Sequence, residues 1–279
     1  MSSNIEDRRG AGGGGFSFGR GPQVGCGGAI ILLVLSLLTG QNFFSFFDGS
    51  GGTGPAPAGP TSTAPVQQSP EEQRTAQFVS FVLDDAQAMW KTLLQREGVQ
   101  YPDAVLVLFR DVTPTACGTG QAASGPFYCP GDQKVYLDLG FFDELHRRFQ
   151  APGDFAHAYV VAHEIGHHVQ NVIGTAGRVR EAQERDRRNA NEYSVRLELQ
   201  ADCYAGIWGF HSAQQNRLDP GDVEEGLGAA SAVGDDRMQE MAGRAPSRES
   251  FTHGSSAQRM EWFQRGFKSG RIGDCDTFR

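Results

Sequence analysis

The sequence has no surplus of basic residues. Its 25 Lys and Arg residues are outnumbered by 33 Asp and Glu residues, and the formal net charge is −8. A protein that binds nucleic acid needs a basic face to neutralise phosphates, so the composition argues against nucleic acid as a partner. The sequence also lacks internal repeats, and its 279 residues are enough for one sizeable domain with additional segments.

No two of the five cysteines have the C-x-x-C spacing of a structural zinc cluster. Cys26 lies in an apolar stretch near the N-terminus, and the other four form an even set that suggests two disulfides in an oxidising compartment. The sequence allows three pairings, and four free or metal-binding thiols are the alternative. We favour Cys117–Cys129, which closes a short loop, and Cys203–Cys275, which would tie the C-terminal tail to a helix.

Charge is absent between Arg20 and Asp48. The centre of this run, 29–38, is strongly apolar, and with its flanks the run supplies the roughly 20 residues that a helix needs to cross a bilayer. We therefore predict one transmembrane helix, a signal anchor, at 22–47. A cleaved signal peptide is the alternative, but no A-x-A-like cleavage site follows the apolar run directly.

The segments on either side of this run set the expected topology. The Gly-rich tail, 1–21, contains three arginines and nothing that can build a core, so we expect it to be flexible and cytoplasmic. A Gly/Pro/Ser/Thr linker, 48–68, follows the run, and no Lys or Arg occurs before Arg74. The positive-inside rule then puts the rest of the chain in the periplasm or outside the cell, as part of a single-pass protein of the cell membrane.

The folded domain is expected at 69–279. Ser69 and Pro70 begin a helix as its N-cap and first residue, and Glu72 fits the third position of a capping box. Strands are expected at 104–109 and 134–139, a loop at 117–129, and helices at 141–150, 154–170, 191–214 and from Asp219 and Ser255 onward. These elements predict an α+β fold that is mostly helical, with a small β-sheet.

One of these helices contains the pattern H-E-x-x-H, as His163, Glu164 and His167. Residues four apart on an α-helix point the same way, so both imidazoles can reach one ion. Zinc accepts imidazole nitrogen readily and prefers four ligands. The pattern predicts a Zn²⁺ site in which Glu164 is the catalytic carboxylate.

A catalytic zinc needs a third protein ligand and one open position. The extended pattern H-E-x-x-H-x-x-G-x-x-H fails, because Gln170 and Ile173 occupy the positions of its glycine and last histidine. His168 lies about 100° from the preceding residue around the helix, and His157 is also on another face. We expect these two histidines to be polar surface residues or to support a ligand.

Glu198 is the better candidate for the third ligand. It lies on the helix expected at 191–214, and Asp202, four residues later, shares its face. An E-x-x-x-D arrangement lets the glutamate bind metal while the aspartate accepts a hydrogen bond from the far nitrogen of a ligand histidine. The alternative is an exposed acidic pair, but Asp202 lies among Ala201, Cys203 and other apolar residues, where a carboxylate needs a partner.

From about Ser69 onward the chain resembles the bacterial neutral zinc metallopeptidase family. The matching stretches are Gly125-Pro126-Phe127-Tyr128-Cys129-Pro130, Val135-Tyr136-Leu137-Asp138-Leu139, 158–170 around the H-E-x-x-H pattern, 198–206, Gly234-Asp235-Asp236-Arg237 and Phe251-Thr252-His253-Gly254. The Gly-rich N-terminus before an apolar run resembles that family too. The resemblance implies a zincin-like, gluzincin-type metallopeptidase domain behind one membrane anchor.

The expected reaction is hydrolysis of peptide bonds in a protein or peptide substrate. Glu164 would act as general base toward water, and a second donor must stabilise the carbonyl oxyanion. His253 is our first candidate for that donor and Tyr193 a weaker one, while a loop histidine without a role is the alternative. The strand at 135–139 could hold an extended substrate by edge pairing. A membrane-tethered zinc adaptor or chaperone without catalysis is the alternative function.

Overall fold

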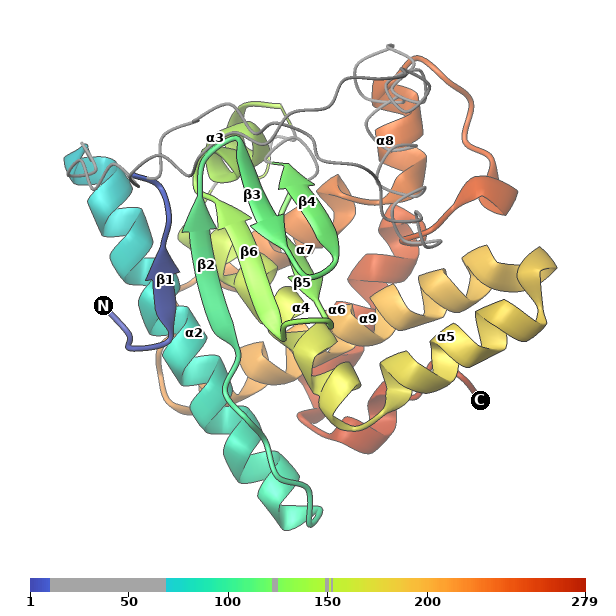
Figure 1. Cartoon of the computed structure of the whole chain (residues 1–279), viewed down its shortest axis with the longest axis horizontal. Coiled ribbons are helices and arrows are strands. Elements are labelled where there is room, and N and C mark those ends of the chain that lie inside the picture. Colours follow the sequence, from blue (N-terminus) through green and yellow to red (C-terminus); the bar gives the residue numbers. More distant parts are fainter. Residues whose placement is uncertain (11–68, 122–124, 149–150, 152) are drawn as a thin grey trace, which may run out of the picture.

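A computed structural model of the chain describes residues 1–10, 69–121, 125–148, 151 and 153–279 (Figure 1). The predicted transmembrane helix at 22–47 and the linker at 48–68 lie outside these described residues. Among the helices that are described, none combines the length and apolar character needed to cross a membrane. The described residues form a mixed α+β domain that is mainly helical, as the sequence predicts.

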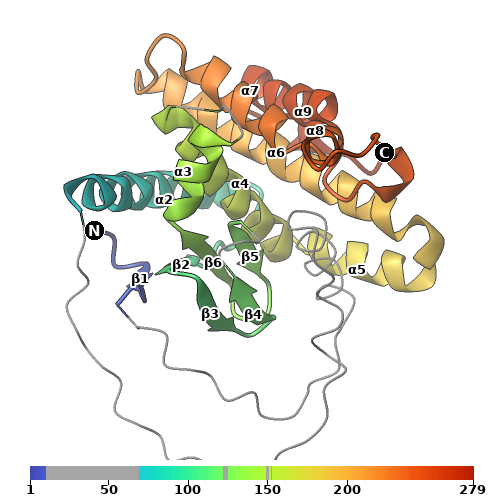
Figure 2. The same ribbon diagram turned by 90° about the horizontal axis from the view of Figure 1, so that it is seen from above.

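A four-stranded sheet forms one layer of the domain (Figures 1 and 2). Its strands are ordered β1 (Ile5–Asp7), β2 (Val105–Phe109), β6 (Lys134–Asp138) and β5 (Phe127–Cys129). The first three are parallel, and β5 runs antiparallel to β6. Strand β2 pairs with all of β6, and β5 pairs with its residues 134–136, so that part of the strand expected to hold substrate offers no open edge.

The helices form two further layers (Figure 2). Helices α2 (Pro70–Arg96) and α4 (Asp154–Val172) lie against the sheet, and α4 separates it from an outer group of helices. That group consists of α6 (Ala190–Gln214), α7 (Asp222–Ala232) and α9 (Ser256–Ser269). The remaining helices of the described residues are α3 (Gly140–Arg147), α5 (Thr175–Arg185), α8 (Asp235–Met241) and three short 3₁₀ turns, Arg187–Asn189, Arg248–Ser250 and Ile272–Cys275. Helix α4, which contains the H-E-x-x-H pattern, is therefore central.

The strand β2 shows how the sheet divides two apolar clusters. Leu106 and Leu108 belong to the main core between the sheet and the helices, whereas Val107 and Phe109 face a smaller cluster on the opposite side. This alternation is the period of two that a strand imposes. A hairpin of β3 (Val112–Thr115) and β4 (Gly118–Gln121) forms a second sheet beside the smaller cluster.

Glycines set the closest approaches between the helices around α6. A side chain at Gly206 would collide with the backbone of Phe263, and one at Gly266 with the backbone of Cys203, so α6 and α9 cross in backbone contact. On α4, a methyl group at Gly166 would lie 3.0 Å from the carbonyl oxygen of Ala201. The glycine inside the H-E-x-x-H pattern therefore lets α4 and α6 approach closely enough for their side chains to share one site.

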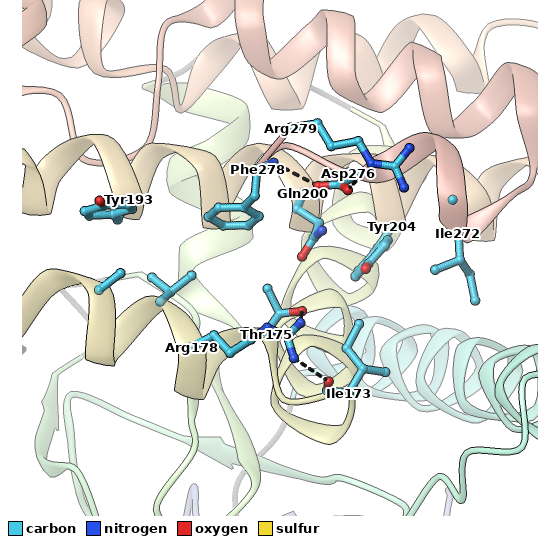
Figure 3. A pocket seen from close by; sticks show the side chains of 13 residues that line it. Ile173, Thr175, Arg178, Tyr193, Gln200, Tyr204, Ile272, Asp276, Phe278 and Arg279 are labelled. Carbon is cyan, nitrogen blue, oxygen red and sulfur yellow. Dashed lines mark hydrogen bonds and ion pairs between the residues drawn. The ribbon is translucent and has the colours of Figure 1, made fainter.

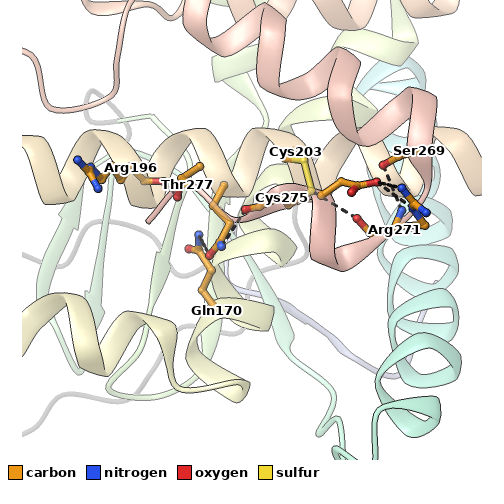
Figure 4. Close-up of a disulfide and its surroundings, with 9 residues drawn as sticks. Gln170, Arg196, Cys203, Ser269, Arg271, Cys275 and Thr277 are labelled. Carbon is orange, nitrogen blue, oxygen red and sulfur yellow. Dashed lines mark hydrogen bonds and ion pairs between the residues drawn. A yellow bond between two sulfur atoms is a disulfide. The ribbon is translucent and has the colours of Figure 1, made fainter. Parts of the chain in front are cut away.

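Both favoured disulfides are present. Cys117 in the turn of the hairpin bonds Cys129 at the end of β5, with 5.8 Å between Cα atoms. Cys203 on α6 bonds Cys275 near the C-terminus, with 5.6 Å between Cα atoms (Figure 4). Both Cα separations lie in the usual range for disulfides. The second bond fixes the C-terminal tail to the helix, as the sequence suggested.

The N-terminal residues differ from the expectation of an unstructured tail. Residues 5–7 form β1, which extends the sheet beyond β2. The Glu72 side chain, expected to complete a capping box, instead pairs with Arg9 and Arg110, while Ser69 still caps the backbone of α2. The tail prediction rested on the lack of an apolar pattern, and a strand made by backbone pairing with a neighbour needs no such pattern.

Candidate metal centre

Three side chains converge where α4 crosses α6. His163 and His167 are one turn apart on α4, and Glu198 faces both of them from α6. The Nε2 atom of His163 lies 3.2 Å from one carboxylate oxygen of Glu198, and that of His167 lies 3.4 Å from the other. One ligand atom from each residue lies within 4.8 Å of the other two. The structure thus brings together the three residues that the sequence predicts as metal ligands.

The donor set suits zinc. Two imidazole nitrogens and one carboxylate oxygen match the three protein ligands of a catalytic zinc site and leave the fourth position open. Beside them Glu164 is buried, with 7% of its surface exposed, and its Oε2 atom has no hydrogen-bond partner among the described residues. A buried polar atom without a partner is costly unless a ligand or water supplies one, so this orphan oxygen supports a site built for solvent or substrate.

The carboxylates of this site have opposite electrostatic environments. Burial raises the pKa of Glu164, and the neighbouring histidines only partly oppose that effect. Burial also acts on Glu198, but the charge of His167 and hydrogen bonds from both histidines outweigh it and hold the pKa of Glu198 well below its ordinary value. Two carboxyl groups with separated pKa values are typical of an acid–base residue beside a fixed anion.

His163 is oriented from behind by Asp202. The Nδ1 atom of His163 donates to a carboxylate oxygen of Asp202 over 2.9 Å, which directs Nε2 toward Glu198. Asp202 has no exposed surface, and it also accepts hydrogen bonds from Tyr159 and, through both oxygens, from Arg259 on α9. Burial would raise the pKa of Asp202, but the charges of Arg259 and His163 outweigh burial and lower it. The predicted supporting aspartate is therefore at the centre of a buried network.

Sequence reasoning missed Tyr159 and Arg259. Arg259 is 3% exposed although it carries a charge, and it lies one turn before Phe263 on the buried face of α9. An arginine at an apolar helix position was the available signal, because a buried guanidinium requires an anionic partner.

His167 is oriented by a separate chain of amides. Its Nδ1 atom donates to Oε1 of Gln170 over 2.9 Å, and Nε2 of Gln170 donates to Oε1 of Gln200 over 3.1 Å. Gln200 in turn donates to the carbonyl oxygen of Cys275 over 3.0 Å (Figure 4). The C-terminal disulfide is thus connected to the imidazole of His167 through two buried glutamines.

His253 lies in the loop before α9, with 36% of its side chain exposed. Its Nδ1 atom is 3.2 Å from Asp235, whose other oxygen accepts backbone N–H groups from Thr252, His253 and Gly254. Burial lowers the pKa of His253, but the bond to Asp235 and the charge of Glu198 outweigh burial and raise it. His253 is thus fixed by a carboxylate and electrostatically coupled to the cluster, as an oxyanion donor would need to be.

The other candidates lie apart from this cluster. Tyr193 lines a cavity of about 530 Å³ between α5, α6 and the C-terminal tail (Figure 3). His157 stacks on Phe142 with ring centroids 4.0 Å apart. His168 is fully buried, between the Tyr128 hydroxyl and the carbonyl of Pro102, so it is neither a surface residue nor a support for a ligand.

Comparisons with known proteins agree with this geometry. A family described as "Putative neutral zinc metallopeptidase" matches residues 1–278. The chain is 43% identical over 281 residues to the "Uncharacterized protein YpfJ" of Escherichia coli strain K12, covering 99% of this chain and 96% of the relative. It is 41% identical over 202 residues to the "Uncharacterized protein Rv2575" of Mycobacterium tuberculosis strain H37Rv, covering 68% of this chain and 66% of the relative. No solved structure matches.

Proposed function

Because the chain belongs to the neutral zinc metallopeptidase family, we propose that it is a zinc-dependent peptidase whose metal is held by His163, His167 and Glu198. The observation that carries the proposal is the convergence of these three side chains within 4.8 Å beside a buried Glu164 with an unpartnered oxygen. These residues would hold a zinc ion whose Lewis acidity would be available to the scissile carbonyl and to water.

Side chains of the protein carry out proton transfer, oxyanion stabilisation and positioning of the histidines. Glu164, whose pKa is raised by burial, takes a proton from the attacking water and delivers it to the leaving amine. His253, held by Asp235, donates a hydrogen bond to the carbonyl oxygen as negative charge develops there. Asp202 and Gln170 hold the two imidazoles with Nε2 toward Glu198, so that little reorganisation accompanies the reaction.

The proposal extends to the setting of the reaction. The apolar segment at 22–47 supports attachment to a lipid bilayer, and the two disulfides support a compartment outside the cytoplasm. Substrates would then be proteins or peptides of the periplasm or the cell exterior.

The full-length chain with Glu164→Gln tests catalysis separately from metal binding. We expect this variant to keep one zinc per chain, measured by plasma mass spectrometry, and to lose about 100-fold or more of its hydrolysis of labelled casein or a peptide library. Glu181→Gln is the matched control, because that side chain is 64% exposed on α5. A Glu164→Gln protein that keeps both zinc and full hydrolysis would refute Glu164 as the base.

The alternative function is a zinc-binding adaptor or chaperone without catalysis. A site that only binds metal has no need of a buried carboxyl group with an unpartnered oxygen at Glu164. The same experiment separates the two functions: a wild-type chain that holds stoichiometric zinc but cleaves nothing in the peptide library would favour the adaptor.

A further inference from the structure

The first ten residues form part of the folded domain. Strand β1 is the outer strand of the sheet and lies beside β2, close to α2 (Figure 1). The N–H of Leu106 donates to the carbonyl of Asn4 over 2.8 Å, and the N–H of Arg8 donates to the carbonyl of Leu108 over 2.7 Å. Ile5 packs against the main core. These bonds join the N-terminus to a strand one hundred residues later in the chain.

Side chains hold the same segment to two further parts of the domain, α2 and β6. The side chain of Arg9 is fully buried and pairs with Glu72 on α2 over 3.2 Å, as well as with its neighbour Asp7 over 2.6 Å. Lys134 on β6 pairs with Glu6 over 2.7 Å. A buried guanidinium is tolerated only where its anionic partners are in contact with it, and Glu72 on α2 is one of the two carboxylates that pair with Arg9.

The N-terminal amide is also bound. The backbone N–H of Ser2 donates to the hydroxyl of Ser80 over 2.6 Å, and the hydroxyl of Ser2 donates to Asp84 over 2.5 Å. Contacts thus occur from Ser2 to Arg9, along the whole segment, and they reach α2, β2 and β6. A segment with this many direct partners is a structural strand of the domain.

These contacts constrain the membrane topology. The hydrocarbon core of a bilayer is about 30 Å thick, and hydrogen bonds of 3 Å cannot form across it. We infer that residues 1–10 and 69–279 lie on the same side of the membrane, and that the apolar segment at 22–47 does not separate them. The single-pass arrangement expected from the sequence, with a cytoplasmic N-terminus and an external domain, is incompatible with the folded domain.

The disulfides identify the shared compartment. Both bonds lie within residues 69–279, the part of the chain to which β1 is joined, and such bonds persist in oxidising surroundings. Residues 1–10 therefore accompany the domain to the external side. This assignment uses no feature of the metal centre, so it stands or falls independently of the peptidase proposal.

Cysteine labelling in intact cells tests the sidedness. In the full chain with Cys26→Ser, single probes Ser3→Cys near the N-terminus and Gln95→Cys on α2 are both at exposed positions. A membrane-impermeant maleimide reagent added to intact and to permeabilised cells reports the side of each probe. We expect both probes to react in intact cells, and labelling of Gln95→Cys alone would overturn the inference.

A cross-link tests the contact itself. In the same background, Ser2→Cys with Asp84→Cys replaces a hydrogen-bonded pair by two cysteines that can form a disulfide. A protease site placed in 48–68 allows the chain to be cut between them, so that the disulfide is detected as a link between the two fragments. After cleavage the two fragments should remain joined without reductant and separate with it. Ser2→Cys with Glu181→Cys, on the exposed face of α5, is the control that should not cross-link. Failure of the Ser2–Asp84 pair to cross-link in folded protein would overturn the docked strand.

Discussion

Replacing Asp202 with Asn removes one charge from the buried network behind His163 while keeping the shape of the side chain. Asp202 accepts hydrogen bonds from His163 over 2.9 Å, from Arg259 over 2.8 and 2.9 Å, and from the hydroxyl of Tyr159 over 2.5 Å. An asparagine has one oxygen for these donors, and its amide N–H₂ must face another of them. The substitution therefore leaves Arg259, which is 3% exposed, without a compensating charge.

The magnitude follows from that unpaired charge. Removing one partner of a buried ion pair costs about 3–5 kcal/mol of the free energy of unfolding. For a domain of this size each kcal/mol lowers Tm by about 2–4 °C, so we expect a loss of about 6–20 °C in zinc-free protein. Separately, loss of the carboxylate that orients His163 should weaken zinc binding about 10- to 100-fold.

Urea unfolding of EDTA-treated protein measures the first effect, and competition with a chromophoric chelator measures the second. Asp202→Leu with Arg259→Met should restore most of the stability, because an apolar pair can replace a buried ion pair, while zinc binding stays weak. Asp143→Asn, at a side chain that is 69% exposed, is the matched control. Unfolding free energy and zinc affinity both within error of wild type in Asp202→Asn would refute the network.

Three further results are expected. Gln170→Ala should weaken zinc binding about 10-fold in the chelator assay, because His167 loses the partner that orients its ring. An affinity equal to that of wild type would contradict this. His253→Ala should lower kcat about 10²- to 10³-fold at unchanged zinc content, the size of effect expected for an oxyanion donor, and a loss of zinc instead would reassign the residue. Replacing Cys203 and Cys275 together by Ala should lower the free energy of unfolding by about 2–4 kcal/mol, because the bond closes a loop across 72 positions, and a calorimetric Tm equal to that of wild type would contradict it.

The site was largely predictable because its residues follow helical spacing. His163 and His167 are four apart, as are Glu198 and Asp202, so local periodicity alone indicates which side chains share a face. The contact between these faces of α4 and α6 is part of the tertiary structure, which helical spacing does not predict. It depends on the close approach of the two helices at Gly166. Their roles as ligands remain predictions until metal is measured.

The supporting residues were less accessible to sequence reasoning. Arg259 is 57 positions from Asp202, and their contact depends on α6 and α9 crossing at Gly206 and Gly266. No pattern within a single helix of the sequence predicts which two helices cross. In the sequence, Arg259 is a charged residue on an apolar helix face. Such a position indicates that the arginine needs an anionic partner, but it does not indicate which residue that partner is.

The strands show the same division. Apolar runs at 104–109 and 134–139 predicted β2 and β6, which are buried between layers. Strands β3 and β4 have four residues each and contain Thr with Pro or Gly, and β5 has only three residues, so none of them offers an alternation to detect. Strand β1 exists because the edge of β2 supplies its backbone partners, which a reading of 1–10 alone cannot reveal.

Zinc K-edge X-ray absorption of the zinc-loaded full chain tests the central claim most directly. We predict two imidazole nitrogens at about 2.0–2.1 Å, oxygen ligands at about 2.0–2.2 Å from Glu198 and solvent, and no sulfur. His163→Ala should remove one imidazole from that spectrum, or the metal altogether. Sulfur at about 2.3 Å, or an imidazole count unchanged by His163→Ala, would contradict a site built from His163, His167 and Glu198.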